Sequence, residues 1–581
     1  MLAPQYFLYL AIGPEGRSKL DLSSNPRIDA GVLLAAGFQT IYLIRPAQPL
    51  WIIENTLAKL SVASRQILPR VFWKRAIRFL EELSPGVHFS RQELAVDELV
   101  TDRMEPPDLA SLFSGRCLLL GEIPELLRSN GQNLTWDPEE WLQYLYIEEK
   151  VIREAAVTYD RIGLAYCRRC GSTRQIIEDN CIFCGNTRCL TCTNCQSMGL
   201  AKSCLPLYSA PNPKRLDSKG KIEPVLSFQL TAPQSRASEQ LKLFWEQDPP
   251  EFLVWAVCGA GKTEVSFGII ANALSEGARV LVAIPRKDVV QELLPRFEKA
   301  FPEIGVTGLY GGSGHRFADV PLTIATTHQC LRFYHNFDLI ILDEGDAYPY
   351  QGSAMLHFAV RRSLKSDGKM VIMTATPDRN LITRATSGKM PYVTIPARPH
   401  RKPLIVPELI KRDLKIPSIP GPSLELAPIV KQFLIDIAAN NRRGLIFLPT
   451  IKLINGVGEL LIRWAEPHGI RGSVIHSQVK NRETVKAQLV DGAIHFLVAS
   501  TVLERGITIP NLDVLVLLAD NETVFDSPTL IQIAGRTGRL GEPARVVFIG
   551  KNITKAMRES KEWIIRMNEE GRRLGYLDDN Q

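Results

Sequence analysis

Residues 256–263 read AVCGAGKT. The stretch follows the apolar run FLVWAV and precedes a helical pattern, which is the context of a phosphate-binding loop in an α/β domain. Gly259 and Gly261 let backbone amides turn toward phosphate groups. Lys262 is predicted to bridge the β- and γ-phosphates of ATP, and Thr263 to ligate Mg²⁺. The predicted nucleotide-binding residues of this loop are Ala256, Val257, Cys258, Gly259, Ala260, Gly261, Lys262 and Thr263.

Two acidic residues follow the loop after about eighty residues, in LIILDEGDAYPY (339–350). They come directly after four apolar residues, so they are expected at the carboxyl end of a buried strand, where open α/β sheets bind ligands. Asp343 is predicted to hold Mg²⁺, and Glu344 to act as the general base that deprotonates the attacking water. In this order the two motifs predict nucleotide hydrolysis. In LTAPQ (230–234), Gln234 is a candidate for reading the adenine edge, the alternative being an ordinary surface glutamine.

Short apolar runs alternate with longer helical patterns around these motifs, which predicts parallel sheets with crossover helices. The runs form two sets, 222–395 and 420–551, which predicts two α/β domains. Residues 391–428 contain nine prolines and are expected to form an extended connector. Residues 552–581 have the pattern of one amphipathic helix. Residues 1–160 are expected to form a further α/β domain, in which no catalytic constellation is evident.

The second α/β domain carries two arginines in QIAGRTGRL (532–540). Arg536 and Arg539 are three residues apart, so on a helical turn both would face the same way. An ATPase needs positive charge at the γ-phosphate in the transition state, and an arginine finger supplies it. Because these arginines belong to a separate domain, they would act only when the cleft between the domains is closed. This arrangement couples hydrolysis to domain motion.

Eight of the eleven cysteines lie within residues 161–210, which predicts a zinc-binding module. The first four have the spacing C-x2-C-x10-C-x2-C, typical of two knuckles that grip one tetrahedral zinc ion. The other four are less regular, which leaves open one or two zinc ions and an interleaved pairing of ligands. An iron–sulfur cluster is the alternative, and disulfides are disfavoured in a cytosolic ATPase. The candidate zinc ligands are Cys167, Cys170, Cys181, Cys184, Cys189, Cys192, Cys195 and Cys204.

The net charge of +7 is concentrated around these cysteines. Between Arg161 and Lys221 there are ten Lys or Arg and three Asp or Glu, a net +7. A localised basic region indicates a nucleic-acid site, with a solvated surface as the alternative. Four arginines and two aromatic residues among the ligands are expected to form a grip on single-stranded DNA, or else a protein-docking site. They are Arg168, Arg169, Arg174, Arg188, Tyr166 and Phe183.

The composition is that of a soluble globular protein, with 45% apolar and 23% charged residues. No stretch approaches the roughly 18 consecutive apolar residues of a membrane helix. The sequence therefore predicts a cytosolic protein, which would reach the inner face of the membrane only through partners.

An ordered set of motifs over roughly 230–545 resembles a superfamily 2 helicase. The set comprises LTAPQ, AVCGAGKT, VAIPRKDVV, TTHQ, DEGD, TAT, ASTVLERGIT and QIAGRTGR. The resemblance implies two RecA-like domains with ATP and Mg²⁺ between them. It also implies that Pro285, Arg286, Thr327, His328 and Thr501 contact a nucleic-acid backbone.

Within that superfamily, DEGDAYPY, IPRKDVVQEL, TTHQCLRF and the upstream cysteines are similar to the ComFA family of late competence proteins. This resemblance implies an ATP-driven motor that works on single-stranded DNA in DNA uptake. The implied partners are other competence proteins, of the ComFC type and of the uptake channel. Gly345 in the acidic motif and the long segment 1–160 depart from the family pattern.

Two other functions remain open on the sequence. One is a replication-restart helicase like PriA, in which cysteines interrupt the second motor domain instead of preceding the first. The other is a nucleotide-gated DNA-binding scaffold with little turnover. Measured ATP hydrolysis with and without DNA separates the scaffold from a motor.

Overall fold

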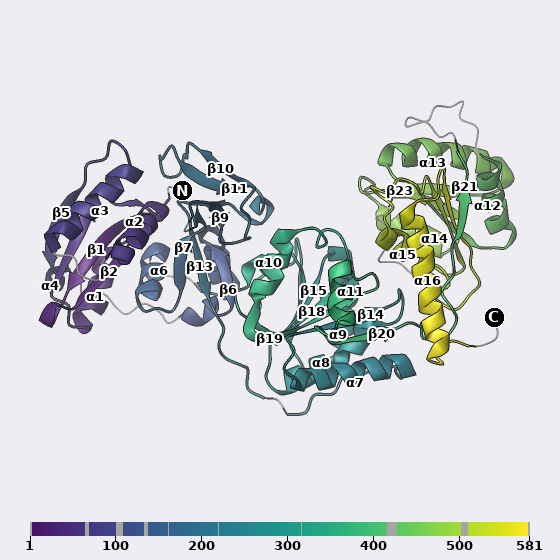
Figure 1. Cartoon of the computed structure of the whole chain (residues 1–581), viewed down its shortest axis with the longest axis horizontal. Coiled ribbons are helices and arrows are strands. Elements are labelled where there is room, and N and C mark those ends of the chain that lie inside the picture. The colour runs from purple at the N-terminus through teal and green to yellow at the C-terminus, as the bar shows by residue number, and fades with distance from the viewer. Residues whose placement is uncertain are drawn as a thin grey trace.

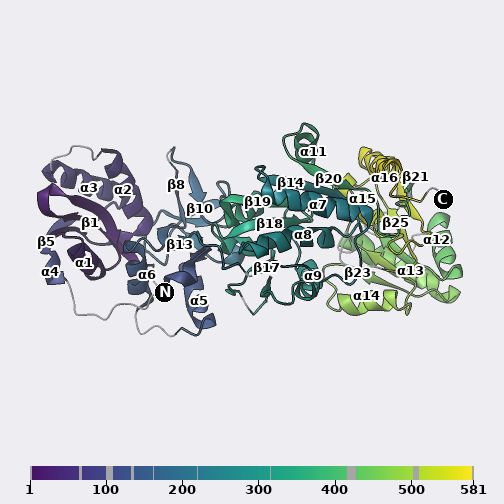
Figure 2. The ribbon, with the colours of Figure 1, turned by 90° about the horizontal axis from the view of Figure 1, so that it is seen from below.

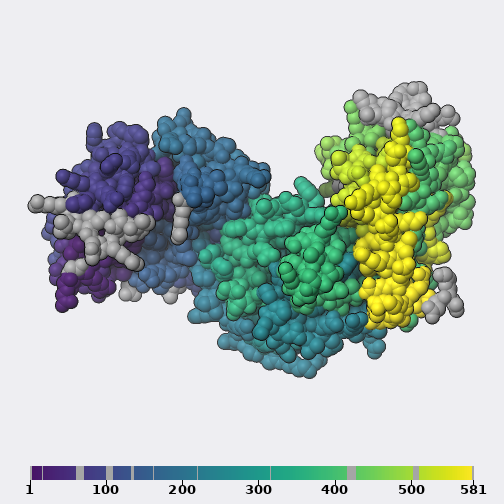
Figure 3. Space-filling model, in the orientation of Figure 1, coloured from purple at the N-terminus to yellow at the C-terminus, as the bar shows by residue number. Residues whose placement is uncertain are grey.

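The computed structural model describes residues 3–63, 69–99, 109–132, 137–160, 162–218, 220–314, 316–414, 427–500 and 509–578. An N-terminal sheet, a cysteine-bearing region and two parallel sheets follow one another along the long axis (Figures 1 and 2). The same succession is visible on the surface in Figure 3. The predicted α/β class with two RecA-like sheets is confirmed.

The N-terminal region is an antiparallel sheet between two helical layers. Its strand order is β2-β1-β3-β5, with β4 beside β1. Side chains of β1 alternate between the two faces: Tyr6 and Leu8 pack with α2 and α3, while Tyr9 and Ala11 pack with α1. The elements are β1 Gln5–Ile12, β2 Ser18–Ser23, α1 Pro26–Ala35, β3 Thr40–Arg45, β4 Gln48–Pro49, α2 Leu50–Ala63, α3 Pro69–Leu83, β5 Ser90–Ala95 and α4 Val96–Leu99.

The middle region joins strands from both sides of the cysteines. β13 pairs with β6 on one side and with β7 on the other, so this sheet spans the predicted domain border at residue 160. The cysteine-bearing strands form a long insertion between β7 and β13. The elements are β6 Arg116–Leu119, the 3-10 helix η3 Leu120–Glu122, α5 Ile123–Ser129, α6 Pro138–Ile147, β7 Ile152–Ala155, β8 Val157–Tyr159, β9 Ala165–Cys167, β10 Ile176–Asp179, β11 Cys189–Cys192, β12 Ala201–Lys202 and β13 Pro206–Ala210.

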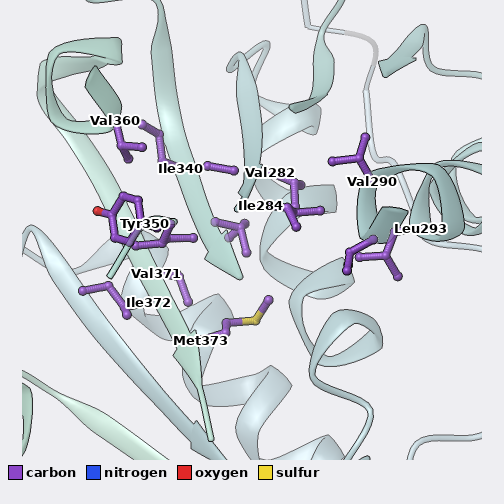
Figure 4. Close-up of a cluster of buried hydrophobic side chains, with 14 of the residues drawn as sticks. Val282, Ile284, Val290, Leu293, Ile340, Tyr350, Val360, Val371, Ile372 and Met373 are labelled. Atoms are coloured by element: carbon purple, nitrogen blue, oxygen red, sulfur yellow. The ribbon is translucent and has the colours of Figure 1, made fainter. Parts of the chain in front are cut away.

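The first of two lobes is a seven-stranded parallel sheet in the order β16-β17-β15-β18-β19-β14-β20. Apolar residues dominate β15 and β17 and most of β14 and β18 because helices cover both faces of a parallel sheet. Figure 4 shows part of this core, with Val282 and Ile340 from neighbouring strands and Leu293 from α9. The elements are α7 Ala232–Glu246, β14 Glu251–Ala256, α8 Lys262–Ser275, β15 Val280–Ile284, α9 Lys287–Ala300, β16 Val306–Leu309, β17 Leu322–Thr326, the 3-10 helix η5 Gln329–Arg332, β18 Phe337–Asp343, α10 Ala354–Ser363, β19 Leu364–Thr374, α11 Arg379–Thr386 and β20 Tyr392–Ile395.

The second lobe is a six-stranded parallel sheet in the order β21-β26-β25-β22-β24-β23. The expectation that residues 391–428 form only an extended connector is wrong. β20 completes the first sheet and β21 the second, because the proline spacing leaves room for two short edge strands. The elements are β21 Glu408–Lys411, α12 Pro428–Ala439, β22 Arg443–Phe447, α13 Ile451–Ala465, β23 Gly472–Ile475, α14 Arg482–Val490, β24 Phe496–Ala499, β25 Leu512–Leu517, α15 Ser527–Ala534, β26 Val546–Gly550 and α16 Lys555–Arg573.

Helix α16 ties the two lobes together. It lies along the second lobe on the side that faces the first (Figure 3, yellow). Thr394 Oγ1 at the end of the first sheet donates to Glu570 Oε1 at 2.6 Å, and Arg566 lies 5.3 Å from the ring centroid of Trp255. The predicted C-terminal helix is therefore part of the interface between the lobes.

Candidate active site

The phosphate loop connects β14 to α8. Gly259 and Gly261 have φ of 79° and 73°, in the left-handed region that glycine adopts without strain. Lys262 begins α8, so free backbone N–H groups of the helix start point toward the loop. The loop has the shape and the partial positive charge that a polyphosphate requires.

Gln234 closes one side of the loop. Its Nε2 donates to Ala260 O at 2.9 Å, while its Oε1 accepts from the backbone N–H of Thr231. A Cβ added at Gly261 would lie 2.4 Å from Gln234 Nε2, so the contact also depends on this glycine. In this structure the amide holds the loop instead of presenting itself to a base, and its role toward adenine stays a prediction.

The two acids lie where β18 ends, as the sequence predicts. Asp343 is buried, and burial raises its pKa to about 7, against an opposing effect of the nearby Lys262. A buried carboxylate beside the phosphate loop fits a cation that would stabilise its charged form, and Thr263 on α8 supplies a second oxygen. Glu344 has a φ of 55°, and its backbone N–H donates to Asp343 Oδ1 at 2.9 Å.

Asp346 and Gln532 connect this site to the second lobe. Asp346 Oδ2 accepts from Thr376 Oγ1 at 2.6 Å and from Gln532 Nε2 at 3.2 Å. Gln532 Oε1 in turn accepts from Cys258 Sγ at 3.1 Å. A side chain of α15 therefore touches both the phosphate loop and the acidic motif. Gln532 is not among the residues predicted from the sequence, although it is the first residue of the QIAGRTGRL motif.

Arg398 is a second connection that the sequence analysis missed. Arg398 is 2% exposed, and its guanidinium donates to three backbone carbonyls: Cys258 O at 2.9 Å, Thr537 O at 2.6 Å and Gly535 O at 2.9 Å. Burial lowers its pKa to about 10. The phosphate loop and the turn after α15 thus share one buried cation. No motif marks Arg398, because it lies in the proline-rich stretch.

Arg536 and Arg539 lie beside the site, but not on a helical turn as expected. Helix α15 ends at Ala534, and both arginines belong to the turns that follow it. Gly538, with a φ of 58°, turns the chain between them in a way a helix does not allow. Burial lowers the pKa of Arg539, and Cys258 and Glu344 are among the groups that oppose this. Arg539 therefore lies near both the loop and the proposed base.

The predicted DNA-contacting residues differ in accessibility. Pro285 and Arg286 follow β15, and Arg286 pairs with Asp288 at 3.0 Å. Thr327 is fully buried, and its backbone N–H donates to Ile284 O at 2.9 Å. His328 is half-buried, so of this pair it is the one that a ligand can reach.

Thr501 is the remaining predicted DNA-contacting residue. It lies outside the described residues.

The eight predicted cysteine ligands form two sets of four. Within each set the thiol sulfurs lie within 4.8 Å of one another, as ligands of one tetrahedral ion must. The first set, called set one, is Cys167, Cys170, Cys192 and Cys195. The second, called set two, is Cys181, Cys184, Cys189 and Cys204.

The expectation that the first four cysteines along the chain hold one ion is therefore wrong, and the interleaved pairing is right. Pairing of β10 with β11 is the physical reason. It sets Ile176 opposite Cys192 and Asp179 opposite Cys189, so that β11 delivers one ligand to each set. Four buried or half-buried thiols in each set fit Zn²⁺.

Two of the arginines expected to grip DNA point inward instead. Arg169 is fully buried and donates to Glu122, while Arg168 Nη1 donates to Glu54 Oε2 at 2.8 Å. Arg188 pairs with Glu178 at the surface, and Arg174 is exposed. The prediction of a DNA grip built from all four arginines is wrong for Arg168 and Arg169, because both guanidinium groups already pair with carboxylates inside the protein.

Comparison with known proteins agrees with this geometry. The model described as Competence protein ComFA N-terminal domain matches residues 102–209. Type III restriction enzyme, res subunit matches 227–379, and Helicase conserved C-terminal domain matches 427–541. Competence protein ComFA of Bacillus subtilis is 36% identical over 412 residues, 69% of this chain and 85% of that protein. The chain belongs to the ComFA family.

The other relatives show where the likeness ends. Competence protein ComFA of Streptococcus pneumoniae is 32% identical over 74% of this chain and 98% of that protein. Replication restart protein PriA of Rickettsia typhi is 26% identical over only 43% of this chain and 40% of that protein. The ComFA resemblance is confirmed, and the chain is an ATP-dependent enzyme of the helicase type. Within the described residues, no helix combines the length and the apolar character needed to cross a bilayer.

Proposed function

We propose that this chain is an ATP-driven motor that translocates along single-stranded DNA during DNA uptake in competence. The observation that carries the proposal is the direct contact of the second lobe with the phosphate loop, through Gln532 and Arg398. A change in nucleotide state at this loop would alter those contacts, so hydrolysis would move one lobe against the other. The competence setting follows from membership of the ComFA family.

The proposed chemistry uses the residues around the phosphate loop. Lys262 holds the β- and γ-phosphates, and Glu344 orients and deprotonates the attacking water. Thr263 and Asp343 would hold Mg²⁺, which neutralises charge on the phosphates when bound. Arg536 and Arg539 supply positive charge to the transition state from the second lobe.

The proposed DNA path runs over the loops that follow β15 and β17, where Arg286 and His328 are accessible. Burial lowers the pKa of His328, so its ring is neutral at neutral pH and would donate or accept a hydrogen bond without adding charge. Hydrogen bonds of this kind would be made to the DNA backbone, so binding would depend little on base sequence. Thr501 would extend the path onto the second lobe.

We further propose that each cysteine set binds one zinc ion, giving two per chain. Four thiolates within reach of one another repel unless a cation lies between them, and metal binding would therefore stabilise this region. The proposed partners are competence proteins of the ComFC type and of the DNA uptake channel, which would bring the motor to the inner face of the membrane.

ATP hydrolysis measured against increasing single-stranded or double-stranded DNA tests the motor. We expect single strands to stimulate the wild type more strongly. We expect Glu344→Gln to bind ATP and lose most turnover, and Arg539→Ala to lose DNA stimulation by a factor of up to about 10³ with DNA affinity retained. Arg463→Ala, on the exposed face of α13, is the matched control. Equal fold-stimulation in wild type and Arg539→Ala would contradict the coupling, and negligible turnover with DNA would favour the scaffold.

A further inference from the structure

We propose that Glu122 is a positioning residue that fixes the DNA-facing loop Thr327–Phe333 against set one. Through it, the cysteine-bearing region sets how the first lobe responds to DNA. The link to DNA rests on the proposed function, whereas the link between Glu122 and the loop stands on the contacts alone.

Glu122 is the last residue of η3, and its carboxylate accepts hydrogen bonds from two buried guanidinium groups. Oε1 accepts from Arg332 Nε at 2.7 Å, and Arg169 Nη2 donates to Oε1 at 3.1 Å and to Oε2 at 3.0 Å. The backbone N–H of Leu119 donates to Oε2 at 3.0 Å. One carboxylate thus holds two cations in a protein interior, where removing it would leave like charges facing each other.

The first of these cations belongs to the DNA-facing loop. Arg332 is the last residue of η5, which begins directly after His328, and its Nη1 donates to Gln329 Oε1. The loop starts at Thr327, whose backbone N–H donates to Ile284 O at the end of β15. Displacement of Arg332 would therefore shift His328 and the neighbouring loop that carries Arg286.

The second cation belongs to set one. Arg169 lies between the ligands Cys167 and Cys170, and its Nη1 donates to Met198 O at 2.8 Å, three residues after Cys195. The guanidinium of Arg169 therefore spans the two ends of set one and reaches Glu122 as well. A change in the shape of set one would move the carboxylate that holds Arg332.

Arg362 of α10 provides a parallel connection between the same two segments. Its Nη1 donates to Arg168 O at 3.1 Å and to Arg169 O at 2.6 Å. Its Nη2 donates to Leu331 O at 2.8 Å and its Nε to Phe333 O at 3.3 Å. One rigid guanidinium thus binds carbonyls of the segment between Cys167 and Cys170 and of the DNA-facing loop. The two segments are therefore expected to move together.

Glu122→Gln tests this positioning role with little change of shape. Hydrogen exchange at residues 327–333 is expected to speed up, because neighbouring charges repel once the carboxylate is gone. The DNA concentration that gives half-maximal ATPase stimulation should rise about 2- to 30-fold, the range typical of residues that modulate coupling. Basal ATP hydrolysis without DNA and zinc content should stay unchanged. Glu178→Gln, which breaks the exposed pair with Arg188 beside set two, is the matched control and should change none of these.

Arg332→Gln keeps the test decisive if Glu122→Gln folds poorly, since Arg169 still compensates Glu122 in it. It should have the same effects, and the double variant should be less impaired than the sum of the two single ones. Unchanged exchange at 327–333 in both variants would overturn the proposal, and so would faster exchange with an unaltered DNA response. A wild type that DNA does not stimulate would refute the proposed function, while the exchange measurement would still decide whether Glu122 positions the loop.

Discussion

Set one and set two each bring four cysteine thiols together and each begin with a C-x2-C pair, but they lie in different surroundings. In set one, Arg168 and Arg169 stand between the first two ligands, and both reach buried carboxylates of other regions. In set two, Ile182 and Phe183 occupy the corresponding positions. Ile182 is 87% exposed, and Phe183 has no charge but accepts from the backbone N–H of Ala3 through its carbonyl at 2.8 Å. Set one is thus a junction between the N-terminal region, the middle sheet and the first lobe, whereas set two packs against the N-terminal segment at Ala3. The thiols set which metal each site suits, and the residues between the ligands decide which other parts of the chain each site contacts.

The largest difference between the sets is expected on ligand removal. Cys170→Ser should lose one zinc ion and most DNA-stimulated ATPase, because the knuckle that holds Glu122 and Arg362 loses its shape. Cys184→Ser should also lose one ion but keep the stimulation. Apparent zinc-binding free energies of about 10–16 kcal/mol in small modules make either loss large locally. Native mass spectrometry and ATPase assays check both variants, and equal loss of stimulation would contradict the assignment of set one as the junction.

A smaller difference is expected for the ion pairs beside each set. Glu54 accepts from Arg168 at 2.8 Å and from the backbone N–H of Ala155 at 2.7 Å. Arg168 Nε also lies 3.2 Å from the more exposed Glu154 Oε1, so Glu54→Gln removes the better buried of the two carboxylate partners of this guanidinium. We expect a loss of about 1.5–3 kcal/mol in the unfolding free energy of this region, because a hydrogen bond to a charged group is lost. Glu178→Gln breaks an exposed pair and should cost about 0–1 kcal/mol. Urea unfolding measures both, and similar costs would show that burial of the pair is unimportant.

Asp29 is a buried carboxyl like Glu54, but its partner is an amide instead of an arginine. Asp29 accepts from Gln143 Nε2 at 2.6 Å, and burial raises its pKa from 3.8 to about 7. The folded state therefore binds more protons than the unfolded state between these values, so stability of the N-terminal region should fall as pH rises toward 7. Asp29→Asn should remove this dependence and melt at a higher temperature than wild type at pH 8. The same dependence of melting temperature on pH in the two proteins would contradict this role of Asp29.

The smallest effect is expected in the rate of metal loss. All four ligands of set one are buried, whereas Cys184 of set two is only half-buried. A chelator should therefore remove the ion of set two first, and DNA-stimulated ATPase should survive this first step. Time-resolved native mass spectrometry with parallel ATPase assays follows the order of release. Loss of stimulation together with the first ion would reverse the roles given to the sets.

The sequence by itself determined the two-lobed architecture and the position of the phosphate loop. The spacing of AVCGAGKT, the acids after an apolar run and the alternation of runs and helical patterns follow from local rules of strands, helices and turns. They were enough to predict two parallel sheets, the phosphate loop and Asp343 at the end of β18. Local rules also gave the number and type of the cysteine ligands.

Only the tertiary structure decided which groups meet. The pairing of β10 with β11 divided the cysteines, and burial beside Glu54 and Glu122 turned Arg168 and Arg169 from expected DNA contacts into internal links. Gln532 and Arg398 reach the phosphate loop from far along the chain, by contacts with side-chain and carbonyl groups that no spacing encodes. The physical reason is that a buried charge takes whichever partner the fold brings within hydrogen-bond distance, and sequence separation does not limit that choice.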